Sequence, residues 1–234
     1  STLTILAASW LRYVRGLNVL VVDCDFPQNS IVELREREKK AVMKNDAYKL
    51  MLQRQFERLQ KKAYPVIRST PENAENDVQV FLASESEPYD VVLYDLPGTM
   101  GTKGVIYTIS LLNYLFIPMR ADRLVMQSTL NFAQTVYDKF VENPATNIQE
   151  VFLFWNMEDR RERTNIYTLY ERILATLDMK VYISRIQMRS KFSRELADAD
   201  GTVYRSTLFR SDGTFLRESG MAALMDEICT TIGI

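Results

Sequence analysis

Apolar residues are distributed along the chain in a regular alternation of short and long segments. Short apolar runs lie at residues 19–22, 91–94, 115–117, 151–155 and 181–186, and a longer segment with helical spacing follows each of the first four. Buried strands separated by helices are typical of a mainly parallel sheet with helices on both faces. The pattern therefore predicts an α/β fold with a doubly wound sheet.

A further helix is predicted at the start of the chain. Apolar residues near one helical face are Leu3, Leu6, Ala7, Trp10, Leu11 and Val14. Gly16 then breaks the spacing before the first strand. A helix needs partners for its first amides, and no residue stands before Ser1 to supply them. From the sequence alone, we expect the segment that begins this helix to lie outside the given chain.

Length and composition favour one large domain over residues 1–234. The chain has 234 residues, of which 47% are hydrophobic, enough for a sizeable core. Its 29 basic and 30 acidic residues balance, so nucleic acid or an acidic membrane would have to bind a local patch. We find no apolar run of the 18 residues expected for a membrane span.

The chain lacks two of the usual tools of enzyme chemistry. It contains no histidine, which excludes a Ser-His-Asp triad and zinc held by histidine. Its two cysteines, Cys24 and Cys229, form neither a disulfide framework nor a metal cluster, which favours a reducing cytoplasm. Chemistry here must use carboxylates, Lys, Arg or a bound metal.

Residues 31–63 form a charged helical insertion with more basic than acidic residues. Its apolar positions at helical spacing are Tyr48, Leu52, Phe56, Leu59 and Ala63. Solvated surface helices are the favoured interpretation, and an arm that binds a partner or DNA is the alternative. The basic residues that would serve such an arm are Lys39, Lys40 and Lys44.

Candidate site residues follow the predicted strands, because parallel sheets bind ligands beyond the carboxyl ends of their strands. Asp23 and Asp25 follow the first strand, and alternation would point both carboxylates toward one divalent ion or one attacking water. Asp95 and Gly98 end the stretch YDVVLYDLPG, where a carboxylate can hold a magnesium-bound water and a glycine amide can approach a phosphate. Asn156 follows a later strand, where its amide can hydrogen-bond a purine. Each of these elements alone is also compatible with an ordinary turn.

Taken together and in this order, VLVVDCDFPQ, YDVVLYDLPG and FLFWNMED resemble the ParA/MinD family of P-loop ATPases, which has a P-loop NTPase (SIMIBI-like) fold. The resemblance covers essentially the whole chain. Ser1-Thr2 resembles the end of the family's deviant Walker A motif, KGGxGK[ST][ST], whose glycine loop and lysines we expect ahead of residue 1. A chain without them is expected to bind nucleotide poorly.

The resemblance implies a role for each candidate residue. Ser1 would bind Mg²⁺, with Asp23 and Asp95 supporting the metal, and Thr2 would lie at the phosphates at the start of the helix. Asp25, assisted by Asp23, would orient the attacking water. The remaining contacts to ATP or ADP would come from Gly98 and Asn156.

The sequence departs from the family pattern at three places. Phe26 is an extra residue in the DxDPQ motif, Gly98 replaces a proline, and Ile186-Gln187 stands where the family has a proline. The last part of the chain resembles ParA-type partition proteins of Bacteroides-like conjugative elements. The implied protein is bacterial and cytoplasmic, and associates with the nucleoid.

The resemblance implies an ATP-dependent switch that forms a homodimer, hydrolyses ATP slowly with Mg²⁺, and binds nonspecific DNA and a ParB-like partner. The DNA-contact candidates in a basic local segment are Arg189, Lys191 and Arg194. A membrane-bound relative is disfavoured, because the terminal helix has an apolar stripe but no basic polar face. Two alternatives stay open: an ATP-dependent synthetase of the dethiobiotin-synthetase kind, and an interaction module that does not hydrolyse ATP.

Overall fold

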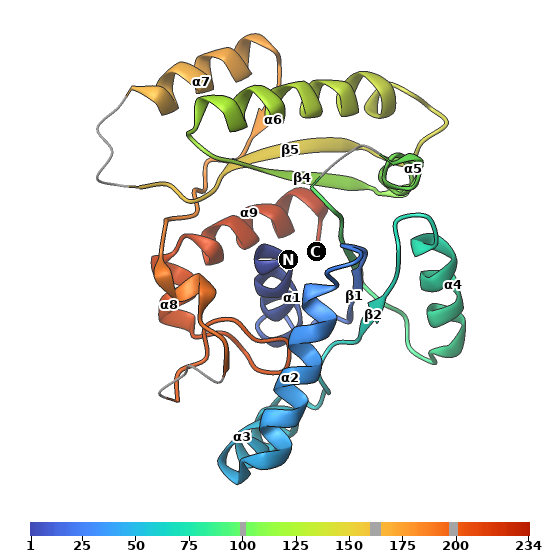
Figure 1. Ribbon diagram of the computed structural model, residues 1–234, viewed down its shortest axis with the longest axis vertical. Helices are drawn as coiled ribbons and strands as arrows, with labels where there is room; N and C mark the ends of the chain where they lie inside the picture. The colour runs from blue at the N-terminus through green and yellow to red at the C-terminus, as the bar shows by residue number, and fades with distance from the viewer. Residues whose placement is uncertain (99–101, 160–164, 197–200) are drawn as a thin grey trace. The chain divides into compact units, whose positions relative to one another are not determined.

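The computed structural model describes residues 1–98, 102–159, 165–196 and 201–234. The chain divides into two compact units (Figure 1). Unit 1 contains Ser1–Val105 and Ser190–Phe215, and unit 2 contains Ile106–Arg189 and Leu216–Ile234. The helices α5 (Lys103–Leu111) and α8 (Gly213–Glu218) each belong partly to both units.

Unit 1 is built on a parallel three-stranded sheet. Its elements in chain order are α1 (Thr2–Tyr13), β1 (Val19–Asp23), α2 (Ser30–Lys44), α3 (Asp46–Leu59), β2 (Val66–Arg68), α4 (Ala74–Ser84), β3 (Val91–Asp95) and the 3₁₀ turn η2 (Ser190–Ser193). The strand order is β2-β1-β3. All five residues of the central strand β1 are buried, as expected for a strand covered on both faces.

The register of this sheet brings two strand ends together. Val19 pairs with Val91 at one end of β1 and β3, and Asp23 pairs with Asp95 at the other. Leu20 and Val22 of β1 pack in one buried cluster with residues of α4. Because the core fixes the register, the two carboxylates are neighbours at the carboxyl edge of the sheet.

The charged stretch after β1 forms two helices, α2 and α3, which lie side by side in Figure 1. Asn45 separates them, and its side-chain oxygen accepts hydrogen bonds from Ala47 N and Tyr48 N at the start of α3. Tyr48 also packs against a buried cluster that includes Leu208 and Phe209. The apolar face of the helix pair thus covers the segment 201–212, and most of its charges face solvent.

Unit 2 contains a second parallel sheet, with the order β4-β5-β6. Its elements are β4 (Tyr114–Met119), α6 (Arg123–Val136), the π-helical turn η1 (Tyr137–Val141), β5 (Glu150–Trp155), α7 (Ile166–Thr176), β6 (Lys180–Val181) and α9 (Met221–Ile232). Every residue of β5 is buried. The α/β class with parallel strands flanked by helices is confirmed.

The prediction of a strand over residues 181–186 was wrong in its extent. The observed β6 comprises Lys180–Val181 only. The backbone nitrogens of Ile183 and Ser184 donate instead to the Glu227 carboxylate of α9, at 2.9 and 3.0 Å. This side-chain acceptor replaces a neighbouring strand, so the ladder ends early.

The apolar stripe of the terminal helix is part of the core. The buried side chains of α9 are Met221, Ala222, Leu224, Met225, Ile228 and Cys229. Core packing therefore accounts for this stripe. Among the described residues, the search for a helix with the length and apolar character of a bilayer span found none.

Candidate functional site

Three of the predicted site residues meet in unit 1, where the carboxyl ends of β1 and β3 face the start of α1. Asp23 and Asp95 are register partners at the ends of the two strands. The backbone nitrogen of Ser1 lies 3.0 Å from Asp95 Oδ1, and Thr4 Oγ1 donates to the same oxygen at 2.7 Å. The ends of β1 and β3 and the N-terminus of α1 thus form one site, which we call the α1 site.

The two oxygens of Asp23 have different surroundings. Oδ2 accepts hydrogen bonds from Ile31 N and Val32 N, both at 3.0 Å, and so caps the first turn of α2. Oδ1 is buried and makes no hydrogen bond of ordinary geometry, although the Asp25 amide lies close to this carboxylate. Burial raises the pKa of Asp23; hydrogen bonds from the backbone amides lower it, and the neighbouring charge of Asp95 raises it further.

Asp95 presents a second oxygen of the same kind. Asp95 as a whole is 6% exposed, and its Oδ2 atom is buried without a partner. Two carboxylates with unpartnered oxygens at adjacent strand ends provide the hard donors that Mg²⁺ prefers. No group of three or more Cys, Asp or Glu side chains that could hold a metal occurs in the part of the chain that the structure describes. Hydroxyl or non-protein oxygens would therefore have to complete such a site, as is usual for Mg²⁺.

The start of α1 adds amides and hydroxyls to the site. Ser1 is the N-cap residue, but its side chain makes no capping hydrogen bond, and the first turn contains no acidic residue. Ser1 Oγ accepts instead from Ser30 Oγ at 2.7 Å, and Thr2 Oγ1 accepts from Arg205 Nη1 at 3.1 Å. The first amides of a helix and its dipole favour an anion at this position.

Asp25 lies beyond the end of β1, so strand alternation does not determine where its side chain points. It is partly buried, and its carbonyl oxygen accepts from Asn29 N at 2.8 Å. The extra residue Phe26 is 62% exposed in the turn between them. Asn29 has φ = 43°, in the left-handed region, and directly precedes α2. The loop therefore changes direction sharply before its helix begins.

Gly98 and Asn156 belong to different units. Gly98 is exposed, and a Cβ atom there would meet nothing within 4 Å, so the space beside its backbone is open. Residues 99–101 lie outside the described residues. Asn156 directly follows β5 in unit 2 and donates its backbone N–H to Met119 O at 2.7 Å. The other nucleotide-site candidates all belong to unit 1.

The DNA-contact candidates also fall in different units. Arg189 is exposed in unit 2, and its Nη2 donates to Glu218 O at 3.1 Å. Lys191 Nζ lies 5.0 Å from the ring centroid of Tyr204 in unit 1, and Arg194 is exposed there. The nearby Arg185 forms ion pairs with Glu158 and Glu171, which neutralise part of the basic segment.

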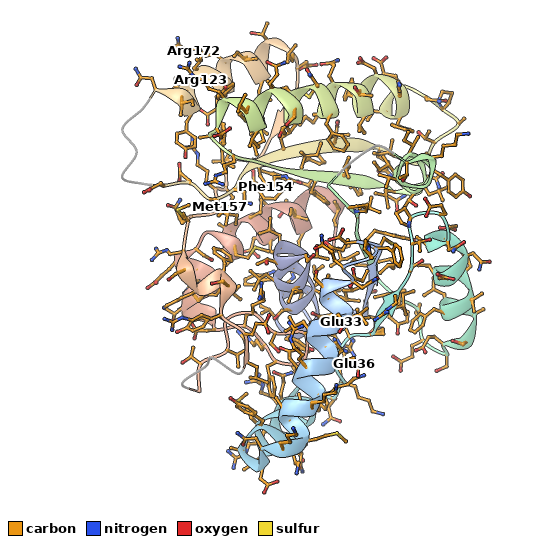
Figure 2. All side chains as sticks on the ribbon, in the orientation of Figure 1. Glu33, Glu36, Arg123, Phe154, Met157 and Arg172 are labelled. Carbon is orange, nitrogen blue, oxygen red and sulfur yellow. The ribbon has the colours of Figure 1, made fainter. Side chains whose placement is uncertain are left out.

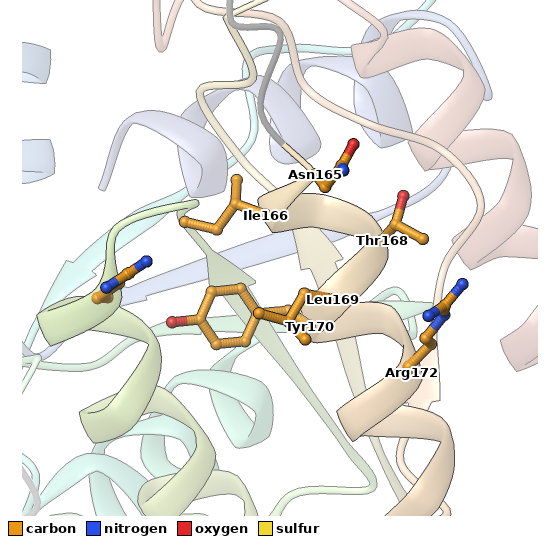
Figure 3. Close-up of a pocket in the computed structure, with 7 residues that line it drawn as sticks. Asn165, Ile166, Thr168, Leu169, Tyr170 and Arg172 are labelled. Atoms are coloured by element: carbon orange, nitrogen blue, oxygen red, sulfur yellow. The ribbon is translucent and has the colours of Figure 1, made fainter.

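Unit 2 carries a pocket that the sequence analysis did not predict. It has a volume of about 720 Å³ and lies between the first residue of α6 and the first turns of α7 (Figure 3). Its lining residues are Arg123, Asn165, Ile166, Thr168, Leu169, Tyr170 and Arg172. Figure 2 shows Arg123 and Arg172 on the two helices. None of the predicted site residues is in its lining.

Three residues at the α1 site were missed. Thr4 and Ser30 contact Asp95 and Ser1, and Arg205 contacts Thr2. A hydroxyl one turn into a predicted helix would have been a weak signal for Thr4. No signal along the sequence links Arg205 to the start of the chain, because only tertiary folding brings them together.

No known family model matches the chain, and no curated protein matches it. Several solved structures share its architecture, including the following three. A plasmid partition protein from Borrelia burgdorferi is 15% identical with a TM-score of 0.56, covering 97% of this chain and 92% of that chain. A structure described as that of a plasmid partition protein from the same organism, bound to AMPPNP, is 16% identical with a TM-score of 0.59, covering 97% and 93%.

The third is the MinC:MinD cell division protein complex of Aquifex aeolicus. It is 14% identical with a TM-score of 0.57, covering 100% of this chain and 90% of that chain. Identities this low establish architecture alone, since one fold hosts many functions. The chain therefore shares the fold of these plasmid partition and MinD structures.

Proposed function

We propose that this protein is an ATP-dependent dimerising switch of the DNA-partition type, which hydrolyses ATP slowly. The observation that carries the proposal is the pair of buried carboxylates at the start of α1. Asp23 Oδ1 and Asp95 Oδ2 are both buried without a partner. Buried oxygens without a partner are costly, and they are suited to a bound cation. The fold shared with an AMPPNP-bound partition protein adds support.

In this proposal, each strand-end residue has a task toward the nucleotide. Thr2 and the first amides of α1 bind phosphate oxygens, and the open backbone at Gly98 allows a close approach to the terminal phosphate. Ser1 Oγ, Asp23 and Asp95 would hold Mg²⁺, which neutralises phosphate charge when bound. Asn156 binds the base through its side-chain amide.

Asp25 is proposed to orient the attacking water. It follows the metal-facing Asp23 by two residues, and its position in the loop before α2 is fixed through Asn29. A carboxylate here can accept a hydrogen bond from water and align it with the terminal phosphate. The identification as a deviant Walker A ATPase, and as one from a Bacteroides-like conjugative element, rests on the sequence motifs.

The proposed partners are a second copy of the chain, nonspecific DNA and a ParB-like protein. The partition proteins of the same fold support this choice, and the MinC:MinD complex is an example of this architecture bound to another protein. The basic side chains Arg189, Lys191 and Arg194 are the proposed DNA contacts. Their phosphate contacts would not depend on sequence.

Parallel measurements of nucleotide binding and turnover in the full-length protein test the proposal. We expect Asp25→Ala to reduce MgATP turnover by at least about a hundredfold, the lower end of the range for a positioned proton acceptor, with AMPPNP affinity within about threefold of wild type. Asp226→Ala, on the exposed surface of α9, serves as the matched control and should retain both activities. Wild-type protein that neither binds nor hydrolyses ATP would contradict the proposal.

A further inference from the structure

We infer that Arg205 is a phosphate-binding residue of the α1 site and that Glu195 holds it in place until the ligand binds. The inference rests on the proposed function and extends it to a residue far from the sequence motifs. The ligand is the phosphate chain of a nucleotide. Both residues belong to unit 1, as does α1.

Arg205 reaches the start of α1 from the segment before α8. Its Nη1 donates to Thr2 Oγ1 at 3.1 Å, and Thr2 is the first residue of α1. The Thr2 amide is one of the first four N–H groups of the helix, which lack intrahelical partners. A phosphate that accepts from these amides would therefore lie beside the guanidinium.

The guanidinium has hydrogen-bonding capacity to spare. Nη2 donates to Glu195 Oε1 at 2.9 Å and to Ser193 O at 3.5 Å, whereas Nε is buried and has no partner. A buried N–H without an acceptor is costly, so this donor is suited to an acceptor on a bound ligand. Phosphate oxygens suit the planar donor set of arginine, which binds them in pairs.

The carboxylates of the site give an independent reason to expect a ligand there. The Asp95 side chain is 7% exposed, and its Oδ2 has no partner although Oδ1 contacts the first turn of α1. Phosphate next to Asp95 and Asp23 would be repelled unless positive charge accompanied it. Arg205 supplies such a charge from the protein, on the side of Thr2.

Glu195 is bound in a way that allows the exchange. Besides the hydrogen bond from Arg205, its carboxylate accepts from Arg37 Nη2 of α2, at 2.9 Å to Oε1 and 3.1 Å to Oε2. If Arg205 turned to a phosphate, Glu195 would keep Arg37 as an ion-pair partner. The exchange therefore replaces one charge-assisted hydrogen bond with another and leaves no carboxylate unpaired.

Two substitutions test the inference because they should have opposite effects. In the full-length protein, we expect Arg205→Gln to weaken binding of ADP and Mg-AMPPNP about tenfold to a hundredfold, the range for a hydrogen bond to a charged group. Glu195→Gln removes the competing charge and should tighten binding about threefold. Arg210→Gln, an exposed arginine of the same segment, should leave affinity unchanged. Thermal melting of the ligand-free variants checks their folding.

The outcomes separate the inference from the proposed function. If Arg205 only supported the Thr2 hydroxyl, Glu195→Gln would loosen it and weaken binding as Arg205→Gln does. That result, or unchanged affinity in a folded Arg205→Gln protein, overturns the inference while ATP binding by the wild type stands. Wild-type protein that binds neither nucleotide overturns both.

Discussion

At the residue scale, one carboxylate oxygen of Asp23 has a structural role and the other has no hydrogen-bond partner. Its Oδ2 holds the first amides of α2, and its Oδ1 is buried beside the end of β3 with no partner. Burial is the main cause of its raised pKa, and Asp95 adds to it. The ligand-free protein therefore carries a penalty for keeping Asp23 ionised, the kind of cost that functional sites retain.

The raised pKa of Asp23 predicts a definite pH dependence of stability. The folded state binds the Asp23 proton more tightly than the unfolded state, so the penalty is absent below the ordinary carboxyl pKa. It grows as the pH rises toward the raised pKa and is constant above it. The free energy of unfolding of wild type minus that of Asp23→Asn should thus fall over this window, by about 1.4 kcal/mol per unit of pKa elevation.

Urea unfolding of both proteins between about pH 4 and 8, without nucleotide or Mg²⁺, measures this difference. Asparagine does not titrate, so any change in packing that it causes shifts this difference by the same amount at every pH. The pH dependence of the difference therefore reports on Asp23. A difference that stays flat or rises with pH would contradict the raised pKa.

The same scale shows what sequence could and could not predict about the site. Asp23 and Asp95 follow apolar strands, and parallel topology alone places such residues at one edge. Arg205 has no comparable marker, because its contact with Thr2 depends on the path of a long segment through the fold. Asp25 was expected on the same side as Asp23, but β1 ends before it, so alternation no longer applies.

At the element scale, long helices and fully buried strands were predictable and marginal elements were not. β1 and β5 are buried at every position, so their apolar runs are continuous. β2 has three residues and only partial burial, which leaves too little periodicity to detect. β6 ends early because the Glu227 side chain takes the backbone donors that a strand would use.

The junction of α2 and α3 provides a prediction at this scale. Asn45 accepts from two amides at the start of α3, at 2.9 and 3.3 Å, and its own φ of −130° is extended. We expect Asn45→Ala to lower the free energy of unfolding by about 1 kcal/mol, as for other N-cap losses. Chemical denaturation measures the change.

The matched control is Asn131→Ala, in the exposed part of α6, where the Asn131 side-chain oxygen accepts a hydrogen bond from the Gln127 side chain and caps no backbone amide of the described residues. This change should lie within about 0.5 kcal/mol of wild type. Equal effects of the two substitutions would mean that the Asn45 cap does not contribute to the stability of the helix pair.

At the scale of the whole molecule, each unit has its own parallel sheet and buried central strand. The structural likeness to partition proteins spans 97% of the chain, so it includes both units. The parallel α/β class could be predicted because buried parallel strands and their helices leave a periodic record in the sequence. The single domain predicted over residues 1–234 stays a prediction.

DNA binding is a prediction for the whole molecule, because it depends on the proposed ATP-bound dimer. Two copies of the basic segment would double the phosphate contacts, and each contact adds about 0.9 to the slope of log affinity against log salt. Binding should therefore be weak without ATP and steeply dependent on salt with it. Replacing Arg189, Lys191 and Arg194 with Ala should flatten the slope equally for unrelated duplexes, because these contacts read no base edge.

The helix pair α2–α3 provides the competing prediction and the control. Its basic residues for this purpose are Lys39, Lys40 and Lys44. Lys39 already pairs with Glu36 at 2.8 Å, which reduces the charge it offers to a phosphate. The Ala variant of these three lysines should thus keep most of the wild-type slope in filter-binding or anisotropy titrations from about 50 to 200 mM salt. If instead the three-lysine variant lost the salt slope and the Arg189, Lys191 and Arg194 variant kept it, DNA would bind the helix pair. No binding by the ATP-loaded wild type at low salt would exclude both surfaces and favour a protein partner alone or the synthetase alternative, since the proposed switch would then lack its phosphate contacts.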